Sequence, residues 1–447
     1  MKVNLLEGKL RRAFFTLFAS ALGSTIIGTI YASVDIICVG QHSGPTGSAA
    51  IASLNPLWSL MLAPGFLVGV GGSIMMSNRK GNGNMKEAYG FFTVSMILSV
   101  LFSAMVCALL IIYPRELITF FGGEAERLDM ACSYMLPVAI VSPSFTLSAT
   151  ISTFMRNDGE VATPTIATAV GGVINMILDV LLVFTFELGV LGAGLATATG
   201  QLVAFLIMLC YFFRKKCTLK LVKPKKLPDK LKKIFTLGAS AAIIEIAYAL
   251  TSTAYIKTVL DLYGENHLAV YGTASTVALL LFCIYNAVGT ALQPLASANF
   301  GAGNTERVKG AFKISVVTTI LLGVLFTLVT QLFPNLILRM FMDVNDEVML
   351  IGPEILRVYV MAISLTGISI LFTFYFQSVL KRAASVAISL LRGIILPLIF
   401  VFLFPAVFGT EALFYSMPAA ECLTFIIAIL LFIFGRKEKN KEFSIGA

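Results

Sequence analysis

Charged residues are scarce in this chain. Only 13% of its 447 residues are Asp, Glu, Lys or Arg, whereas 57% are hydrophobic and the mean hydropathy is +0.89. Soluble domains carry about 25% charged residues, so the composition excludes an ordinary soluble protein. Apolar runs of about 20 residues recur along the chain, and each can cross a hydrocarbon core of roughly 30 Å as a helix. The sequence therefore predicts an all-α integral membrane protein.

Residues that carry metal or redox chemistry are also few. The two histidines, His42 and His267, fall in polar segments after the first and seventh apolar runs. The seven cysteines include no C-x-x-C pair, and most lie within apolar runs, so we expect them to pack rather than to bind metal or form disulfides. No resident cofactor is expected. A membrane-embedded enzyme would need convergent His, Cys or paired Asp motifs and is the weakest alternative.

The apolar runs give twelve predicted membrane spans: 13–39, 49–77, 90–112, 131–154, 163–186, 192–213, 235–258, 269–298, 311–334, 352–379, 386–406 and 410–435. Most Lys and Arg residues fall in alternate connections between these spans, so the positive-inside rule predicts that both termini are cytoplasmic. The N-terminal MKVNLLEGKLRRAFF has no small-residue cleavage site, so we expect the first span to be retained. We expect a multi-pass protein of the inner (cytoplasmic) membrane. Its net charge of +9 lies in short loops and does not indicate nucleic-acid binding.

The chain contains an internal repeat. KGNGNMKEAYG (80–90) matches FGAGNTERVKG (300–310), and the basic segment RKKCTLKLVKPKKLPDKLKK (214–233) lies between the two halves. We predict an N-terminal lobe (1–213), a basic cytoplasmic linker (214–234) and a C-terminal lobe (235–447). Two six-helix lobes with this topology would be related by a pseudo-two-fold axis along the membrane normal. Transporters built in this way bind substrate near the midplane and alternate access.

The linker has two interpretations. We expect it to be solvated and held near anionic lipid headgroups. A regulatory docking site is the minor alternative.

Ionisable residues inside the spans are the candidate functional groups, because burying one in a bilayer costs at least about 2.5–3.5 kcal/mol. Asn175 and Asp179 are spaced i, i+4 and therefore share one helix face. The corresponding positions of the second half hold Pro397 and Val401, so the polar pair serves only the N-terminal lobe. Asp35 lies in the same half. Two carboxylates in a poorly hydrated lobe cannot both stay ionised without a large cost. We therefore expect a proton, or a monovalent cation such as Na⁺ that prefers oxygen ligands, to neutralise the pair.

Each of these residues also has a structural interpretation. Asn175 and Asp179 could merely form hydrogen bonds across helices, and so could Asp35. Glu245 lies mid-span without a visible partner, which favours a function. Glu421 could pair with Arg392, or it could line a cavity for cations. Glu411 lies near a span end, which suggests an interfacial position.

The segment FMRNDGEVATPTIATAVGGVINMILDVLLVF (154–184) resembles the fourth-to-fifth span region of the multidrug and toxic compound extrusion (MATE) family. The matching positions are Arg156 and Gly159 in a loop, Pro164, and Asn175 four residues before Asp179. GVLGAGLATATGQ (189–201) and ANFGAGN (298–304) are similar to further family segments, and the resemblance covers essentially the whole chain.

This resemblance implies export of amphiphilic organic cations, such as drugs and dyes, in exchange for Na⁺ or H⁺. It implies a coupling-cation site of Asp35, Asn175, Asp179 and Thr197, with Thr199 a less favoured choice for the last. It implies a substrate cavity with Glu245, Glu421 and Arg392, and a gating role for the loop with Arg156 and Gly159. Some members carry an acidic residue in span ten, but this chain has none between 358 and 379.

We therefore expect a secondary active antiporter that works by alternating access on small cationic molecules, and for which a monomer suffices. The nearest rival is a lipid-linked oligosaccharide flippase of the same two-lobed architecture. An anionic pyrophosphate cargo would favour Arg and Lys in the cavity, where the sequence offers only Arg392.

Overall fold

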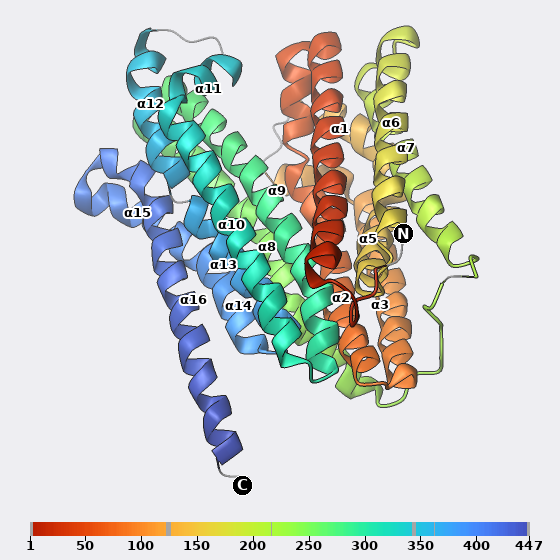
Figure 1. Cartoon of the computed structure of the whole chain (residues 1–447). Helices are drawn as coiled ribbons and strands as arrows, with labels where there is room; N and C mark the ends of the chain where they lie inside the picture. The colour runs from red at the N-terminus through yellow and green to blue at the C-terminus, as the bar shows by residue number, and fades with distance from the viewer. Residues whose placement is uncertain (1–2, 122–126, 216, 342–345, 362, 445–447) are drawn as a thin grey trace. The chain divides into compact units, whose positions relative to one another are not determined.

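The computed structural model describes residues 3–121, 127–215, 217–341, 346–361 and 363–444. These ranges are helical almost throughout and contain no β-strand (Figure 1). Twelve helical stretches among them are long and apolar enough to cross a membrane, which confirms the predicted all-α fold and number of spans. The helices are α1 (Leu10–Ala52), α2 (Asn55–Gly81), α3 (Met85–Ile112), α4 (Pro114–Phe120), α5 (Leu128–Asn157), α6 (Ala162–Val180), α7 (Gly189–Tyr211), α8 (Leu227–Tyr263), α9 (Glu265–Gly301), α10 (Thr305–Leu332), α11 (Pro334–Phe341), α12 (Asp346–Met361), α13 (Ile363–Ser378), α14 (Arg382–Leu390), α15 (Leu396–Phe408) and α16 (Leu413–Ser444).

The structure adds features that hydropathy does not predict. The first span extends to Gly44, whose φ of 67° and ψ of −165° break the helix before the second span begins. Short π-helical turns follow α6 (Leu181–Thr185) and α14 (Leu391–Ile395). The short helices α4 and α11 begin at Pro114 and Pro334, which are 220 residues apart.

The internal repeat is visible in the hydrogen bonds of its turns. Gly83 (φ +81°) and Gly303 (φ +73°) occupy equivalent left-handed positions after α2 and α9. In both turns the amide of the next residue, Asn84 or Asn304, donates to the carbonyl five residues earlier at 2.8 Å. The same backbone turn is therefore built twice from the two matching sequence segments.

The helices form two compact units. Unit 1 comprises Met1–Ile246 and Gln293–Lys309, and unit 2 comprises Ala247–Leu292 and Gly310–Ala447. Unit 1 thus contains the first six spans, the linker, the first part of α8 to Ile246, and residues 293–309 from the end of α9 and the start of α10. The division into lobes at residues 214–234 stays a prediction.

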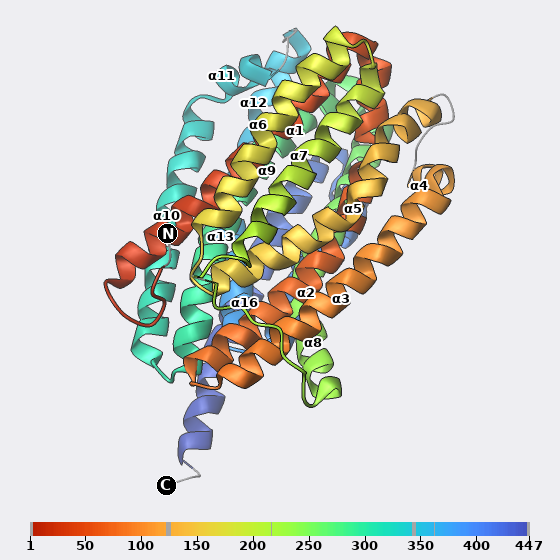
Figure 2. The same cartoon turned by 90° about the vertical axis from the view of Figure 1, so that its right-hand side faces the viewer.

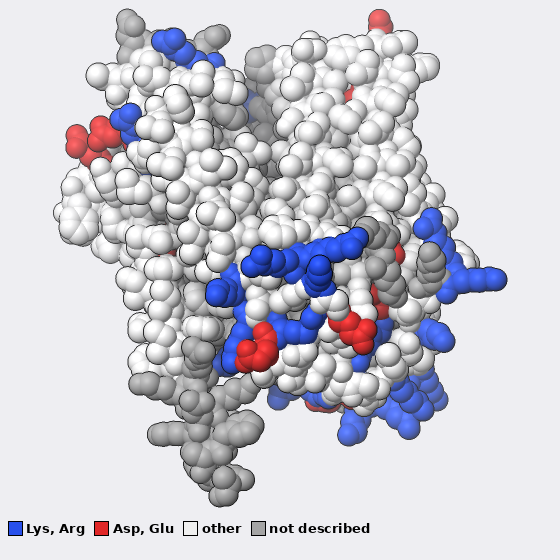
Figure 3. Space-filling view, in the orientation of Figure 1, with Lys and Arg blue, Asp and Glu red and all other residues white. Residues whose placement is uncertain are grey.

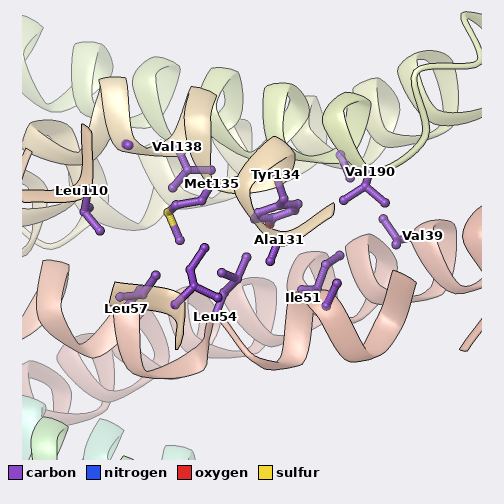
Figure 4. Close-up of a cluster of buried hydrophobic side chains, with 14 of the residues drawn as sticks. Val39, Ile51, Leu54, Leu57, Leu110, Ala131, Tyr134, Met135, Val138 and Val190 are labelled. Carbon is purple, nitrogen blue, oxygen red and sulfur yellow. The ribbon is translucent and has the colours of Figure 1, made fainter. Parts of the chain in front are cut away.

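Unit 1 places α1, α5, α6 and α7 side by side (Figure 2). An apolar core with side chains from α1, α2 and α5 fills the interior, including Val39, Leu54, Leu57 and Met135 (Figure 4). Glycines bring helices into direct backbone contact. A Cβ on Gly238 of α8 would lie 1.7 Å from the carbonyl oxygen of Leu67 on α2, so no side chain fits there.

Unit 2 has its own core of aromatic and aliphatic side chains. Tyr255 and Tyr271 stack with ring centroids 5.8 Å apart, and Tyr359 meets Tyr271 edge to face. Buried leucines and valines from α9, α11, α12 and α15 complete this cluster.

Candidate functional site

Four polar residues predicted from the sequence come together inside unit 1. Asp35 comes from α1, Asn175 and Asp179 from α6, and Thr197 from α7. Their exposed fractions are 5%, 2%, 0% and 7%, respectively. Asp35 and Asp179 lie close enough to interact with each other. The grouping is therefore a feature of the fold, whereas its role in ion coupling stays a prediction.

Tyr134 of α5 completes this group and was missed by the sequence analysis. Its hydroxyl donates to Asp35 Oδ2 at 2.6 Å and lies 3.1 Å from Thr197 Oγ1. Asn175 Nδ2 donates to the same Thr197 oxygen at 3.3 Å. The ring is packed among apolar side chains of α5, including Ala131 (Figure 4). In the sequence, a tyrosine in an apolar span resembles an ordinary packing residue. The one feature that could have identified Tyr134 as a site residue is that a buried phenol hydroxyl needs a hydrogen-bond partner.

Several oxygens of this site have no partner. Asp35 Oδ1, Asn175 Oδ1 and both carboxylate oxygens of Asp179 are buried and accept no hydrogen bond from any described residue. Buried acceptors left in this state are costly, and buried charges more so. The site therefore offers a set of oxygen ligands, two of them carboxylates, that a proton or a small cation would satisfy.

Local backbone features set the geometry of the site. A Cβ on Gly171 would lie 2.5 Å from the Gly200 carbonyl, and one on Gly200 would lie 2.6 Å from the Gly171 carbonyl. This contact brings α6 and α7 together one turn from Asn175. Directly after α6, Leu181–Thr185 adopt a π-helical turn, a feature often found at functional sites.

The two α6 positions of the site are occupied by uncharged residues in the second half of the repeat. Pro397 and Val401, at the positions equivalent to Asn175 and Asp179, are both buried. Tyr255 follows Asp35 by 220 residues, and its hydroxyl lies 2.6 Å from Ser416 Oγ. At the position equivalent to Asp35, the second half therefore has a neutral hydrogen bond in place of a carboxylate.

Arg392 and Glu421 form an ion pair within unit 2. Arg392 Nε lies 3.1 and 3.3 Å from the two carboxylate oxygens, and the side chains are 11% and 2% exposed. The guanidinium also lies over the Phe282 ring at 5.3 Å. Glu421 could pair with Arg392 or line a cavity for cations, and in the structure it pairs with Arg392. Its negative charge is thus matched within its own unit.

Glu245 lies on α8 in unit 1 and is half-buried. Its backbone carbonyl accepts a hydrogen bond from Ser59 Oγ at 3.1 Å, whereas its carboxylate forms no ion pair with a described residue. The Glu245 carboxylate is therefore available to a ligand, whereas the Glu421 carboxylate is paired with Arg392.

The predicted loop residues lie at the other end of unit 1. Arg156 donates to Ser20 Oγ at 3.2 Å and to Ser24 Oγ at 3.0 Å on α1. Gly159 has φ +83°, and its carbonyl accepts a hydrogen bond from the Val3 amide at 2.8 Å. Arg156 therefore ties α5 to α1, and Gly159 fixes the N-terminal segment.

Twelve spans, a repeated turn and a buried carboxylate site define a polytopic helical membrane protein with internal repeats, a design shared by many secondary transporters. The MatE family model matches residues 21–181 and again residues 240–403. The chain therefore belongs to the MatE family, whose members are transporters rather than enzymes, and the double match follows the internal repeat.

Named relatives agree with this assignment. Multidrug export protein MepA of Staphylococcus saprophyticus is 24% identical over 414 residues, covering 91% of this chain and 90% of the relative. MepA of Staphylococcus aureus is 25% identical over 420 residues, with the same coverage.

Solved structures share the fold. One is a multidrug resistance MATE family transporter of the MOP superfamily in an outward-facing conformation, with a TM-score of 0.88, 20% identity and 98% coverage of both chains. Another is a MOP superfamily transporter from Pyrococcus furiosus, with the same score, identity and coverage, for which a binding pocket of reverse polarity suggests a different function.

Proposed function

We propose that this protein is a secondary antiporter that exports amphiphilic organic cations, including drugs and dyes, in exchange for Na⁺ or H⁺. Two full-length relatives are multidrug export proteins, which supports the export of diverse small molecules. We place the protein in the cytoplasmic membrane as a monomer. The distribution of its Lys and Arg residues supports an orientation with both termini on the cytoplasmic side.

The observation that carries the coupling proposal is the set of unpartnered oxygens at Asp35, Asn175 and Asp179. An ion bound there would satisfy acceptors that the protein leaves open, and it would reduce the repulsion between two carboxylates. No cluster of three or more His, Cys, Asp or Glu suited to a metal ion occurs in the described parts of the chain. Two carboxylates with neutral oxygens suit a monovalent ion or a proton better than a divalent metal.

The ion can drive transport only if it binds one conformation better than another. The carboxylates come from α1 and α6, and Tyr134 and Thr197 connect them to α5 and α7. Changes in occupancy would therefore alter the packing of four helices at once. We expect the ion-bound lobe to release cargo and the ion-free lobe to accept it.

The charge of the cargo follows from the groups that remain free. The Glu421 carboxylate is matched by Arg392, which leaves Glu245 to offset a cationic cargo. The same pairing makes Arg392 a poor ligand for an anionic pyrophosphate, so nothing favours the flippase alternative. Because a transporter of the same fold is described with a reversed pocket polarity, the sign of the cargo has to be tested on this protein.

Hydrogen bonds within unit 1 join several helices at the end that we assign to the cytoplasmic side. Asn157 donates to Ser73 Oγ on α2 at 3.1 Å and accepts from Ser297 Oγ on α9 at 3.3 Å. Asn299 Nδ2 also donates to the carbonyl of Leu5 at 2.8 Å. The N-terminal segment and α9 are thus joined to α2 and α5, and we propose that these contacts separate when the transporter opens inward.

The test is dye efflux from proteoliposomes in which Na⁺ and pH gradients are imposed separately. We expect one gradient to drive export of a cationic dye, and we expect Asp35→Asn and Asp179→Asn to abolish that dependence. Thr199→Ala is the matched control for Thr197→Ala, because the Thr199 hydroxyl is exposed and bonds only to its own helix at Leu195. Ion-driven efflux at the wild-type rate in Asp179→Asn would refute the proposed coupling site.

A further inference from the structure

The linker between α7 and α8 is fixed to unit 1 along its inner side. The Thr218 hydroxyl donates to Asp158, which also pairs with Lys80. The Val222 amide donates to Thr93 Oγ1 of α3 at 2.9 Å, and Leu219 is buried between these two anchors. The linker is therefore anchored to unit 1 through Thr218, Leu219 and Val222, whereas most side chains of residues 220–227 are exposed.

The outer side of the same segment combines lysines with exposed leucines. Leu221 is 70% exposed and Leu227 is 46% exposed. The lysines between and beside them are also exposed, and no acidic residue interrupts them: Lys220, Lys223, Lys225 and Lys226. In Figure 3 blue side chains gather along the right-hand edge, where Figure 1 draws this part of the chain. The outer side of the linker therefore presents two exposed leucines within a run of lysines.

The position of the linker along α3 identifies its surroundings. Thr93, which anchors Val222, precedes Ile97 by four residues, or about 6 Å of helix rise. Ile97 is 52% exposed, and further along the same helix Val100 and Leu101 are 52% and 61% exposed. These side chains belong to the apolar surface that faces lipid. The linker therefore lies about one helical turn from the exposed apolar surface of α3, and we infer that it lies at the membrane interface.

We propose that residues 220–227 form a membrane-interface surface that binds anionic phospholipids of the adjacent leaflet. Leu221 and Leu227 insert at the level of the upper acyl chains, and the neighbouring lysines contact lipid phosphates. Basic residues interleaved with apolar ones have this affinity because burial of apolar area and attraction to anionic lipid act together. An acidic protein partner would account for the lysines, but not for exposed leucines at this depth.

The test uses the single tryptophan of the chain, Trp58. Trp58→Phe gives a silent background, and Leu221→Trp then places a fluorophore on the proposed surface. The purified protein is placed in phosphatidylcholine bilayers that contain equal mole fractions of acyl-brominated phosphatidylcholine or phosphatidylglycerol. Ala302→Trp, at an exposed position in the turn between α9 and α10, is the matched control for a solvent-facing site.

We expect the fluorescence of the Leu221→Trp variant to be quenched by both brominated lipids. Brominated phosphatidylglycerol should be enriched around the fluorophore at least about fivefold, the factor that one lysine near an anionic surface supplies. Replacing Lys220, Lys223 and Lys225 together by Gln should remove that preference and leave the quenching by phosphatidylcholine. Absence of quenching, as at position 302, would overturn the membrane location. Equal quenching by the two lipids would overturn the anionic partner. Fluorescence quenching does not require transport. The experiment therefore tests the lipid-binding surface independently of the proposed antiport.

Discussion

Replacing Asp179 by Asn tests whether the buried site is charged and satisfied by an ion. Both oxygens of this carboxylate lack a hydrogen-bond donor among the described residues, and the side chain is completely buried. Holding such a charge costs several kcal/mol, whereas a neutral amide of the same shape avoids most of that cost. Without the coupling ion, Asp179→Asn is therefore expected to be more stable than the wild type.

Binding of the coupling ion should offset part of this cost in the wild type only. Binding at one site stabilises the folded state by RT ln(1 + [ion]/Kd), which is about 2.7 kcal/mol at 100 times the Kd. With an unfolding entropy of about 2.1 cal/mol/K per residue over 447 residues, this corresponds to a rise in Tm of about 3 °C. The wild type should show this rise, and Asp179→Asn should not.

The assay is thermal unfolding of purified protein in detergent. Na⁺ is varied against choline at constant ionic strength, and pH is varied in a separate series, so the two candidate ions are distinguished. Thr199→Ala should keep the wild-type response, because its hydroxyl bonds only within α7. A wild-type Tm that responds to neither ion, or an equal response in Asp179→Asn, would refute the reasoning.

Three further predictions concern packing and charge. Gly238→Ala should lower the free energy of unfolding by more than about 3 kcal/mol, which is the upper end of ordinary overpacking. The reason is that the added methyl group would lie 1.7 Å from a backbone oxygen of α2. Gly272→Ala is the control and should be tolerated in the same thermal assay, because Gly272 has open space around it. Glu421→Gln should cost about 3–5 kcal/mol by leaving Arg392 unpaired, and adding Arg392→Met should restore most of the lost Tm. Gly159→Ala should cost about 1–3 kcal/mol, because φ is +83° there, and should expose the N-terminal segment to limited proteolysis.

Much of the fold follows from sequence patterns that depend only on local chemistry. Twelve apolar runs are sufficient to predict twelve spans, because a helix is the only way for an isolated segment to satisfy its backbone in lipid. The repeat was visible because a left-handed turn needs glycine at Gly83 and again at Gly303. By contrast, α4 and α11 are too short to produce a hydropathy signal, and the helix break at Gly44 depends on a single backbone conformation.

The candidate site was partly predictable for a similar reason. Asn175 and Asp179 stand out because polar residues at i, i+4 in an apolar span are costly, and their common helix face is fixed by geometry. Asp35 and Thr197 followed from the family resemblance. Tyr134 could not be found in this way, because only the tertiary packing of α5 against α1 and α7 places its hydroxyl 2.6 Å from Asp35.

The state of each buried charge is a property of tertiary structure, and this determines which residues remain available to a ligand. Asp179, Glu245 and Glu421 are all acidic residues within apolar spans, and the sequence does not show which of them has a cationic partner. In the structure Glu421 is paired with Arg392 from a neighbouring span, whereas Asp179 receives no donor from any residue that the structure describes. An unpaired buried charge is costly unless something satisfies it, and this cost supports our proposal that the unpaired carboxylates bind the coupling ion or a cationic cargo. The repeat supports this argument, because Tyr255, at the position equivalent to Asp35, forms an uncharged hydrogen bond with Ser416 in unit 2.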